Sequence, residues 1–393
     1  MRRITVDERR ARLGVRHALA DGHGAANVVD AARAVVALHG TDPASTVLAA
    51  LARTPGATTE DVARALYDDR SLVRVIAFRN TVFAVPRDLV PACFAGAADT
   101  VAHVLRRMFH KLLVDTGVTD EPEVWLSTAE AAALDVVRIH DEVTSADLAA
   151  ADPILATRLH LAPGTKYETW QGVASRLLNL LSAQGHVVRA RPKGGWTSTQ
   201  FRWVAVARWA PELAERIEPV EATARIARAW LHSYGPATLD DLQWWTGWTK
   251  TRMREALASV DTIDVDLDGV PGVVLADDEE PVPAPDPWIG LLPALEPSSM
   301  GWKHRDFCLG PHRELLYDIN GNAGPTVWAD GRMVGGWAQR DDGEVVVRLL
   351  GDIGAESAAR IEERAAALTT MLGDVRLKAR ARGWTPVERE LRA

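Results

Sequence analysis

The chain has 393 residues, of which 47% are apolar and 25% charged, and its formal net charge is −8. This size predicts two to four globular domains, each able to bury a core. No apolar run reaches the roughly 18 residues of a membrane span, and the arginine-rich start lacks a signal-peptide pattern, so we expect a cytoplasmic protein that contacts no membrane. The two cysteines, Cys93 and Cys308, lack paired spacing, and the sequence indicates neither a metal site nor another cofactor.

Residues 1–90 are predicted to form a first unit in which helices precede a β-hairpin. A short helix begins after Thr58, whose side chain can cap it, with the acidic Asp61 three positions on. Arg79-Asn80 then separates two apolar runs, which is typical of a hairpin. Helix, capped helix and hairpin is the order of a winged helix-turn-helix. The expected elements are helices at 5–20, 26–38, 43–53 and 58–66 and strands at 71–77 and 81–85.

A short polar corner, His39-Gly40-Thr41-Asp42-Pro43, connects two of these helices. Gly40 is expected to take the left-handed conformation that ends a helix. Asp42 and Pro43 have the residue types preferred at the N-cap and at the first position of the next helix. The corner therefore holds the side chains of His39 and Thr41 on a rigid turn, although a plain helix–helix turn would have the same sequence features.

The same order of elements returns twice, in residues 91–208 and 209–276. Its common signature is Thr-x-x-Asp followed by Val or Leu, which begins at Thr58, Thr144 and Thr238. One copy is a common helix start, but three copies, each between a longer helix and a hairpin, indicate a repeated architecture. We therefore expect three tandem winged-helix units. In the second and third, the expected helices lie at 127–137, 168–184, 221–233 and 249–258 and the hairpins at 186–206 and 262–275.

An acidic, proline-rich linker at residues 277–288 precedes a domain of different character at 289–393. Its apolar runs are separated by Asp330-Gly331 and Asp342-Gly343, which are preferred hairpin turns. The sequence thus predicts an α+β chain, with three tandem winged helix-turn-helix units and a C-terminal β-barrel-like domain, either a small barrel or a meander, that carries one helix. The expected strands of this domain lie at 325–329, 332–339 and 344–350, and the expected helix at 355–372.

Charge is strongly segregated along the chain. Residues 261–287 contain nine acidic residues and no basic one, so the rest of the chain has a formal charge of +1. Residues 169–211 contain six Lys or Arg and no carboxylate, and residues 70–87 contain four arginines and no acid. Such segregation is typical of a basic groove with acidic outer parts. It makes a nucleic acid the expected partner despite the negative net charge.

Five stretches have the character of one family's motifs: VVALHGTD (35–42), LVRVIAFRNTVF (72–83), GHVVRARPKGGWTSTQFRW (185–203), LLPALEP (291–297) and GNAGPTVWADGRMVGG (321–336). With them the chain resembles the AlkZ-like (YcaQ-type) winged-helix DNA glycosylases and the related actinobacterial winged helix DNA-binding domain proteins. The resemblance covers nearly the whole chain. It implies three tandem winged-helix units and a C-terminal β domain that form a C shape around duplex DNA.

The catalytic motif of that family is Gln-x-Gln, and His39 and Thr41 occupy its two places here, so the motif reads His-Gly-Thr. Phe83 is a second departure, at a position where many members have histidine. The resemblance implies hydrolysis of the N-glycosidic bond between a damaged base and deoxyribose. His39 would position a water or accept a proton, and Thr41 would be its hydrogen-bond partner. Asp42 would either stabilise the developing sugar cation or only cap the helix.

Two hairpins carry the residues expected to contact DNA. On the first, Arg74 and Arg79 are candidates for phosphate contacts, or else lie on the exposed face of an amphipathic strand. On the second, a glycine-rich tip with a tryptophan is suited to a DNA groove, although Trp196 could instead pack against Trp203. The candidates on the second hairpin are Arg189, Arg191, Lys193, Trp196 and Arg202.

A further aromatic group, Trp244, Trp245 and Trp248, is expected to fill a core rather than to form a stacking platform. Two functions then fit the sequence. The first is a monofunctional DNA glycosylase, a monomer associated with the nucleoid, that removes alkylated or crosslinked bases from duplex DNA. The second is a non-catalytic winged-helix protein that binds DNA, either as a regulator or at damaged sites. A protein-interaction scaffold is a third alternative, and the first two differ in what His39 and Thr41 do.

Overall fold

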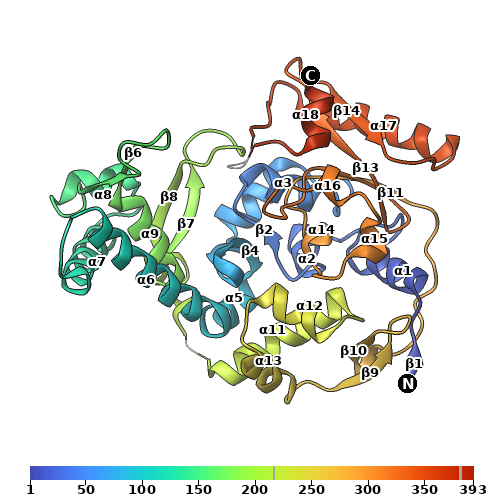
Figure 1. The fold of residues 1–393 in the computed structure, drawn as a ribbon, viewed down its shortest axis with the longest axis horizontal. Coiled ribbons are helices and arrows are strands. Elements are labelled where there is room, and N and C mark those ends of the chain that lie inside the picture. Colours follow the sequence, from blue (N-terminus) through green and yellow to red (C-terminus); the bar gives the residue numbers. More distant parts are fainter. Residues whose placement is uncertain (216, 380–382) are drawn as a thin grey trace.

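The computed structural model describes residues 1–215, 217–379 and 383–393, in which helices alternate with five small sheets. Figure 1 shows two parts: residues 99–205 form a lobe on one side, and the remaining elements form a larger body that holds both termini. The lobe has its own apolar core, which includes Leu126, Leu177 and Trp203. The body has a second, larger core, to which residues of the first, third and C-terminal segments contribute.

The first unit contains a three-stranded sheet that the sequence predicted only in part. Strand β2 (Leu38–His39) pairs with β4 (Val82–Pro86), which in turn pairs with β3 (Leu72–Ile76). The helix expected to reach Leu38 ends at Arg33, because pairing with β4 outweighs the local helical spacing. The helices of this unit are α1 (Val6–Arg16), α2 (Val28–Arg33), α3 (Pro43–Leu51) and α4 (Thr59–Ala63).

Gly40 has a different role from the predicted one. Its φ is not positive, and its N–H donates to the carbonyl of Val82 at 2.7 Å. A Cβ at this position would lie 3.1 Å from the carbonyl carbon of Phe83 and 3.1 Å from Val82 Cγ1. The glycine therefore allows the corner to approach β4 closely, and the expected left-handed helix end is wrong.

The same cap starts a short helix in each of the three predicted units. Thr58, Thr144 and Thr238 each accept a hydrogen bond from the backbone N–H of the aspartate three positions on, whose carboxylate accepts one in return. A hairpin follows each time, so the repeat of capped helix and hairpin is confirmed. The second and third copies are α8 (Ser145–Ala151) with β7 (Val187–Pro192) and β8 (Phe201–Ala205), and α12 (Leu239–Thr246) with β9 (Thr262–Asp266) and β10 (Pro271–Leu275).

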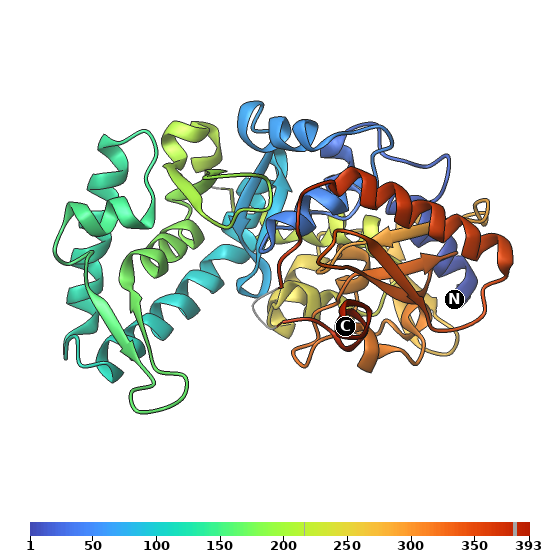
Figure 2. The same ribbon diagram turned by 90° about the horizontal axis from the view of Figure 1, so that it is seen from above.

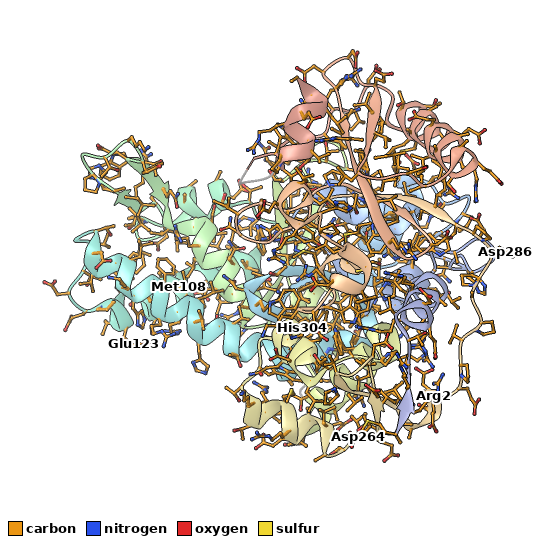
Figure 3. The ribbon with its side chains drawn as sticks, turned by 45° about the vertical axis from the view of Figure 1, so that its right-hand side comes forward. Arg2, Met108, Glu123, Asp264, Asp286 and His304 are labelled. Carbon is orange, nitrogen blue, oxygen red and sulfur yellow. The ribbon has the colours of Figure 1, made fainter. Side chains whose placement is uncertain are left out.

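Two further pairings were not predicted. Strand β1 (Arg2–Arg3) lies parallel to β9, so the start of the chain joins the third hairpin, and Figure 3 shows Arg2 and Asp264 at the same end of the molecule. A second hairpin, β5 (Arg158–Leu161) and β6 (Thr169–Gly172), is inserted between α8 and α9. The remaining helices of these units are α5 (Val90–Cys93), α6 (Asp99–Asp115), α7 (Pro122–Ile139), α9 (Val173–Ala183), α10 (Val206–Trp209), α11 (Pro219–Tyr234) and α13 (Lys250–Leu257).

The C-terminal segment contains an open antiparallel sheet in the order β11-β12-β13-β14. The predicted barrel is wrong, because the described chain provides four strands here and the two outer ones, β11 and β14, do not pair with each other. The alternative prediction, a meander, agrees with this order of antiparallel strands. Helix α17 packs against β11 and β14, and α18 packs against β13. The elements are β11 (Ile289–Leu292), α14 (Pro297–Met300), α15 (Asp306–Leu309), α16 (Arg313–Leu316), β12 (Thr326–Ala329), β13 (Arg332–Gln339), β14 (Val345–Leu349), α17 (Ala355–Leu372) and α18 (Pro386–Arg392).

Among the described helices, no single one has both the length and the apolar character needed to cross a membrane. The bent pair Arg87–Ala97 and Thr100–Asp115 satisfies that criterion only when both arms are counted together.

Candidate active site

His39 lies at the edge of the first sheet, with its ring next to that of Phe83. The two residues are paired across β2 and β4, and their ring centroids are 5.7 Å apart. The residue keeps part of its surface exposed, but Nδ1 is enclosed and has no hydrogen-bond partner in the described part of the chain. Burial, and secondly the positive charge of Arg79, lower the pKa of His39 to about 3. The imidazole is therefore neutral at neutral pH and is a hydrogen-bonding group rather than a strong base.

Thr41 and Asp42 follow on the turn that enters α3. The Asp42 carboxylate accepts hydrogen bonds from the backbone N–H of Ser45 at 2.9 Å and from its hydroxyl at 2.6 Å. The predicted N-cap role of Asp42 is thereby confirmed. Thr41, in contrast, is exposed. Thr41 is thus the most exposed of the three polar residues of the corner, since His39 and Asp42 are partly buried.

Thr41 opens into a cavity of about 620 Å³ between the body and the lobe. The opposite side of this cavity is formed by α8, α9 and the hairpin β7–β8. The sequence placed the corner in the first unit and these segments in the second, and the structure brings them together around one cavity. The lining does not include His39, and it does include Thr41, Ser175, Asn179, Arg189, Lys193 and Phe201.

Two basic side chains face Thr41 across the cavity without a carboxylate within salt-bridge distance among the residues that the structure describes. Arg189 donates to Asn179 Oδ1 at 3.0 Å, and its guanidinium lies 5.1 Å from the ring centres of Phe201 and Trp203. Burial, and secondly the charge of Arg74, lower the pKa of Arg189 to about 10, so it stays protonated at neutral pH. Lys193 is exposed and acts on Asp147 only at longer range. The cavity therefore has uncompensated positive charge, which suits a phosphate backbone.

Three other predicted cations have partners within the protein. Arg74 is only 2% exposed, and its guanidinium donates to the Tyr67 hydroxyl. It cannot reach a phosphate from there, so that prediction is wrong: the packing of β3 against residues of the second unit buries this strand on both faces. Arg191 pairs with Asp68 at 2.8 Å and Arg202 pairs with Glu142 at 3.4 Å. Both are on the surface, and their expected contact with DNA stays a prediction.

Trp196 lies at the tip of the loop between β7 and β8 and is partly buried. It packs against apolar clusters of the body, one of which includes Leu48 of α3 and Trp337 of β13. The expected alternatives were a free wedge and a contact with Trp203, and the observed contact is neither. The tip of this hairpin therefore touches the body on the far side of the cavity.

Arg79 occupies the turn between β3 and β4 and lies over an indole. Its backbone has φ 51° and ψ 38°, and its guanidinium carbon is 4.0 Å from the ring centre of Trp244. Arg305, which the sequence analysis missed, lies 4.8 Å from the same ring. No carboxylate forms an ion pair with either arginine in the described ranges. Trp245 and Trp248 are buried as predicted, whereas Trp244 is only partly buried.

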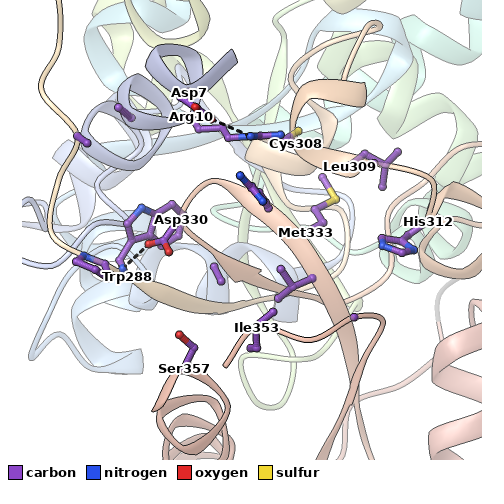
Figure 4. A pocket seen from close by; sticks show the side chains of 18 of the residues that line it. Asp7, Arg10, Trp288, Cys308, Leu309, His312, Asp330, Met333, Ile353 and Ser357 are labelled. Atoms are coloured by element: carbon purple, nitrogen blue, oxygen red, sulfur yellow. Dashed lines mark hydrogen bonds and ion pairs between the residues drawn. The ribbon is translucent and has the colours of Figure 1, made fainter. Parts of the chain in front are cut away.

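A larger cavity, of about 750 Å³, lies elsewhere, between α1 and the C-terminal sheet (Figure 4). Two of its polar groups have partners: Arg10 donates to Asp7 at 3.1 Å, and Asp330 accepts from the backbone N–H of Trp288 at 2.8 Å. It contains none of the residues predicted from the sequence. No group of three or more His, Cys, Asp or Glu side chains suited to a metal ion occurs among the described residues.

The corner, the repeated units and the basic cavity agree with a family of DNA glycosylases. A model of the family described as "DNA glycosylase AlkZ-like" matches residues 32–371, and the chain belongs to this family. A relative, the interstrand DNA cross-link repair glycosylase of Streptomyces sahachiroi, is 30% identical over 172 residues, which is 42% of this chain. The aligned stretch spans about half of that relative, 46% of its length.

The fold is also similar to a solved structure, that of the Streptomyces sahachiroi DNA glycosylase AlkZ. The superposition has a TM-score of 0.73 and covers 96% of this chain and 99% of the other. Sequence identity over it is 20%, so this likeness concerns the fold. The family resemblance read from the sequence is confirmed.

Proposed function

We propose that this protein is a monofunctional DNA glycosylase that hydrolyses the N-glycosidic bond of alkylated or crosslinked bases in duplex DNA. Membership of the AlkZ-like family supports the reaction class. The observation that carries the proposal for this chain is that Thr41 shares one cavity with the unpaired cations Arg189 and Lys193. We take the three units of capped helix and hairpin as winged helices that present their basic surfaces to the duplex.

The chemistry needs little acid catalysis, because an alkylated purine already carries positive charge and leaves readily. The protein has to unstack the nucleotide, place a water near C1′ and stabilise an oxocarbenium-like sugar. Neutral His39 can accept a hydrogen bond from that water through Nε2, since Nδ1 is the enclosed nitrogen. The Thr41 hydroxyl can hold the same water from the cavity side. Asp42 contributes negative charge near the sugar while its carboxylate caps α3.

Phosphates on either side of the lesion would be held by the cations that lack carboxylate partners. Arg189 and Lys193 lie on the lobe, and Arg79 lies on the body. Arg191 and Arg202 would have to exchange Asp68 and Glu142 for phosphates, so their contribution to affinity is smaller. This division of roles makes the binding of damaged duplex DNA strongly dependent on salt.

The deciding experiment measures base release from a duplex that contains alkylated purines, with abasic sites as the readout. We expect release by the wild type and a loss of about 100-fold in His39→Ala, with a smaller loss in Thr41→Ala. Arg225→Ala is the matched control, because Arg225 is a surface residue paired with Glu221 at 2.6 Å. A wild type that binds the duplex tightly and releases no base would overturn the proposal.

That outcome would support the second candidate, a non-catalytic DNA-binding protein. One observation favours it: His39 does not line the cavity, and its Nδ1 is enclosed. If His39 is the catalytic group, the nucleotide has to reach beyond the residues that line the cavity. Comparison of binding and base release on the same damaged duplex separates the two functions.

A further inference from the structure

The hairpin β5–β6 presents two large aromatic side chains to solvent. Tyr167 is 71% exposed and Trp170 is 51% exposed, and all four residues of β6 are exposed. On β5, Leu159 is buried in the core of the lobe and anchors the hairpin. Figure 2 shows the hairpin as an arm that projects from the lobe. Apolar surface held out in this way is typical of a contact site.

The arm has a defined conformation. His160 and Trp170 are partners across the two strands, and their rings stack at 4.3 Å with an angle of 3° between their planes. His160 Nε2 lies 2.7 Å from Glu168 Oε1, and the backbone N–H of Gly164 donates to the other carboxylate oxygen at 2.9 Å. These contacts lie within the hairpin and order its turn. The aromatic groups are thus held in place before a partner arrives.

The charge around the arm selects the kind of partner. Between Arg158 and Arg176 the chain has three basic residues and one acid, Glu168. The carboxylate of Glu168 is already engaged by His160 and Gly164. Lys166 lies 5.0 Å from the Tyr167 ring and Arg158 lies 5.7 Å from the Trp170 ring. A surface that alternates cations and aromatic rings fits a polyanion with flat bases or sugars.

The arm also adjoins the candidate active site. Strand β6 ends at Gly172 and α9 begins at Val173, and Ser175 in the first turn of α9 lines the cavity that Thr41 enters. Helix α8, on the other side of the inserted hairpin, contributes Ser145 to the same cavity. The two helices that carry the arm therefore both reach the site.

We propose that hairpin β5–β6 is a second DNA-binding element, which places Tyr167 and Trp170 against the duplex beyond the damaged nucleotide and Arg158 and Lys166 near its phosphates. This inference rests on the proposed function, since it assumes duplex DNA in the cavity. The arm would lengthen the contact with DNA and increase the binding affinity, and it would take no part in the hydrolysis of the N-glycosidic bond. Short duplexes that fill only the cavity would not reach it.

The test compares the full chain with the double variant Tyr167→Ala/Trp170→Ala on undamaged duplexes of two lengths. We expect the affinity for the longer duplex to fall by about tenfold and the affinity for the shorter one to change little. Val124→Ala/Ile139→Ala is the matched control, because these apolar side chains of α7 on the same lobe are 63% and 75% exposed. Circular dichroism and the melting temperature verify that both double variants are folded.

A second measurement uses Lys166→Ala and the slope of log affinity against log salt concentration. On the longer duplex this slope should fall in magnitude by about one. Unchanged affinities of the aromatic variant at both lengths, with an unchanged slope for Lys166→Ala, would overturn the inference. Self-association of the wild type that the aromatic variant loses, with DNA affinity unchanged, would also overturn it and assign the arm to a contact between two copies.

These results are separable from those on the proposed function. Base release at saturating protein concentration reports on the corner and the cavity. Suppose that the wild type releases no base and the aromatic variant shows a length-dependent loss of binding. This outcome would support the DNA-binding role of the arm and contradict the proposed glycosylase function. Normal base release by the wild type, with unchanged DNA binding by the aromatic variant, would support the glycosylase function and contradict the role of the arm.

Discussion

His39 and Phe83 lie opposite each other across β2 and β4, with ring centroids 5.7 Å apart. The sequence suggested two independent departures from the family's motif, one at the corner and one at position 83. In the structure they are neighbours and form one local change. The phenyl ring supplies apolar surroundings to the imidazole, which contributes to the burial that keeps His39 neutral.

Base release should therefore depend little on pH between about 5 and 9. The pKa of His39 is lowered to about 3, so the neutral imidazole dominates throughout this range. Single-turnover rates measured across it test the expectation. In Arg79→Met the removal of the nearby positive charge should raise the pKa of His39, as followed by NMR of the imidazole. Arg191→Met, whose charge is paired with Asp68, is the control. A midpoint near 6.5 in the wild-type profile would contradict the expectation.

Gly40→Ala should destabilise the protein and reduce base release. The new Cβ would lie 3.1 Å from the carbonyl carbon of Phe83, and backbone cannot move aside as a flexible side chain does. We expect a loss of about 1–3 kcal/mol in the free energy of unfolding, measured with urea. Gly351→Ala is the control, since nothing lies within 4 Å of a Cβ there. Equal stability of the two variants would count against the close approach.

The buried ion pair of Arg53 and Glu296 joins the end of α3 to the C-terminal segment. Both side chains are fully buried, and Arg53 also donates to Ser298 Oγ at 2.8 Å. Glu296→Gln leaves the arginine charge uncompensated, and we expect a loss of about 3–5 kcal/mol in the free energy of unfolding. Arg225→Gln breaks an exposed pair and should cost less than about 1 kcal/mol. Similar losses in both variants would show that burial of the pair is unimportant.

His17 should make the fold sensitive to acid. It is fully buried, with Nδ1 2.8 Å from Ser298 Oγ and Nε2 3.0 Å from the Ser233 carbonyl, and burial followed by the charge of Arg53 lowers its pKa to about 3. Between about pH 6.5 and 3 the unfolded chain binds a proton that the folded chain does not. The contribution of neutral His17 to the free energy of unfolding is fully present above this window. Inside the window it decreases as the pH falls, by up to about 1.4 kcal/mol per pH unit.

Urea unfolding at pH 7 and pH 5 measures this sensitivity. His17→Gln should lower stability at pH 7 and make it less dependent on pH, because the titrating group is absent. His39, with its similarly lowered pKa, keeps part of the dependence in the variant. The same change in stability with pH in the wild type and in His17→Gln would argue against a neutral, buried His17.

The cations of the cavity should dominate the salt dependence of DNA binding. Arg189→Ala and Lys193→Ala each remove an uncompensated charge that faces Thr41, and each should reduce the magnitude of the salt slope by about one. Arg202→Ala removes a charge paired with Glu142 and should change the slope less. Binding titrations of a duplex at several salt concentrations give these slopes. A larger effect of Arg202→Ala would reverse the assignment of the phosphate contacts.

Local signals predicted the repeated elements well. Each Thr-x-x-Asp cap is set by residues three positions apart, so Thr58, Thr144 and Thr238 could be identified without knowledge of the fold. Contacts between distant segments decided the rest. Leu38 joins a strand because of β4, and the C-terminal sheet stays open because β11 and β14 do not pair. Hairpin β5–β6 was missed because the expected helix at 168–184 was extended over β6, whose four residues are all exposed and show no alternating apolar pattern.

The sequence predicted several residues of the candidate site but not how they are arranged in space. Thr41, Arg189 and Lys193 were all named from the sequence, and their meeting in one cavity depends on how the lobe sits against the body. Arg74 was misplaced for the same reason, since the Phe201 ring that lies near it belongs to another unit. Arg305 carried no signal, because its relation to Trp244 exists only in three dimensions.

Strand β1 completes a sheet whose other members, β9 and β10, lie late in the chain, and Ile4 is fully buried beside Val265. During synthesis β1 therefore stays unpaired until β9 has left the ribosome. This sheet cannot form in the order of the chain, because β1 has to wait for a partner that is far away in the sequence. A ribosome-stalled fragment that stops before β9 should leave this segment open to proteases.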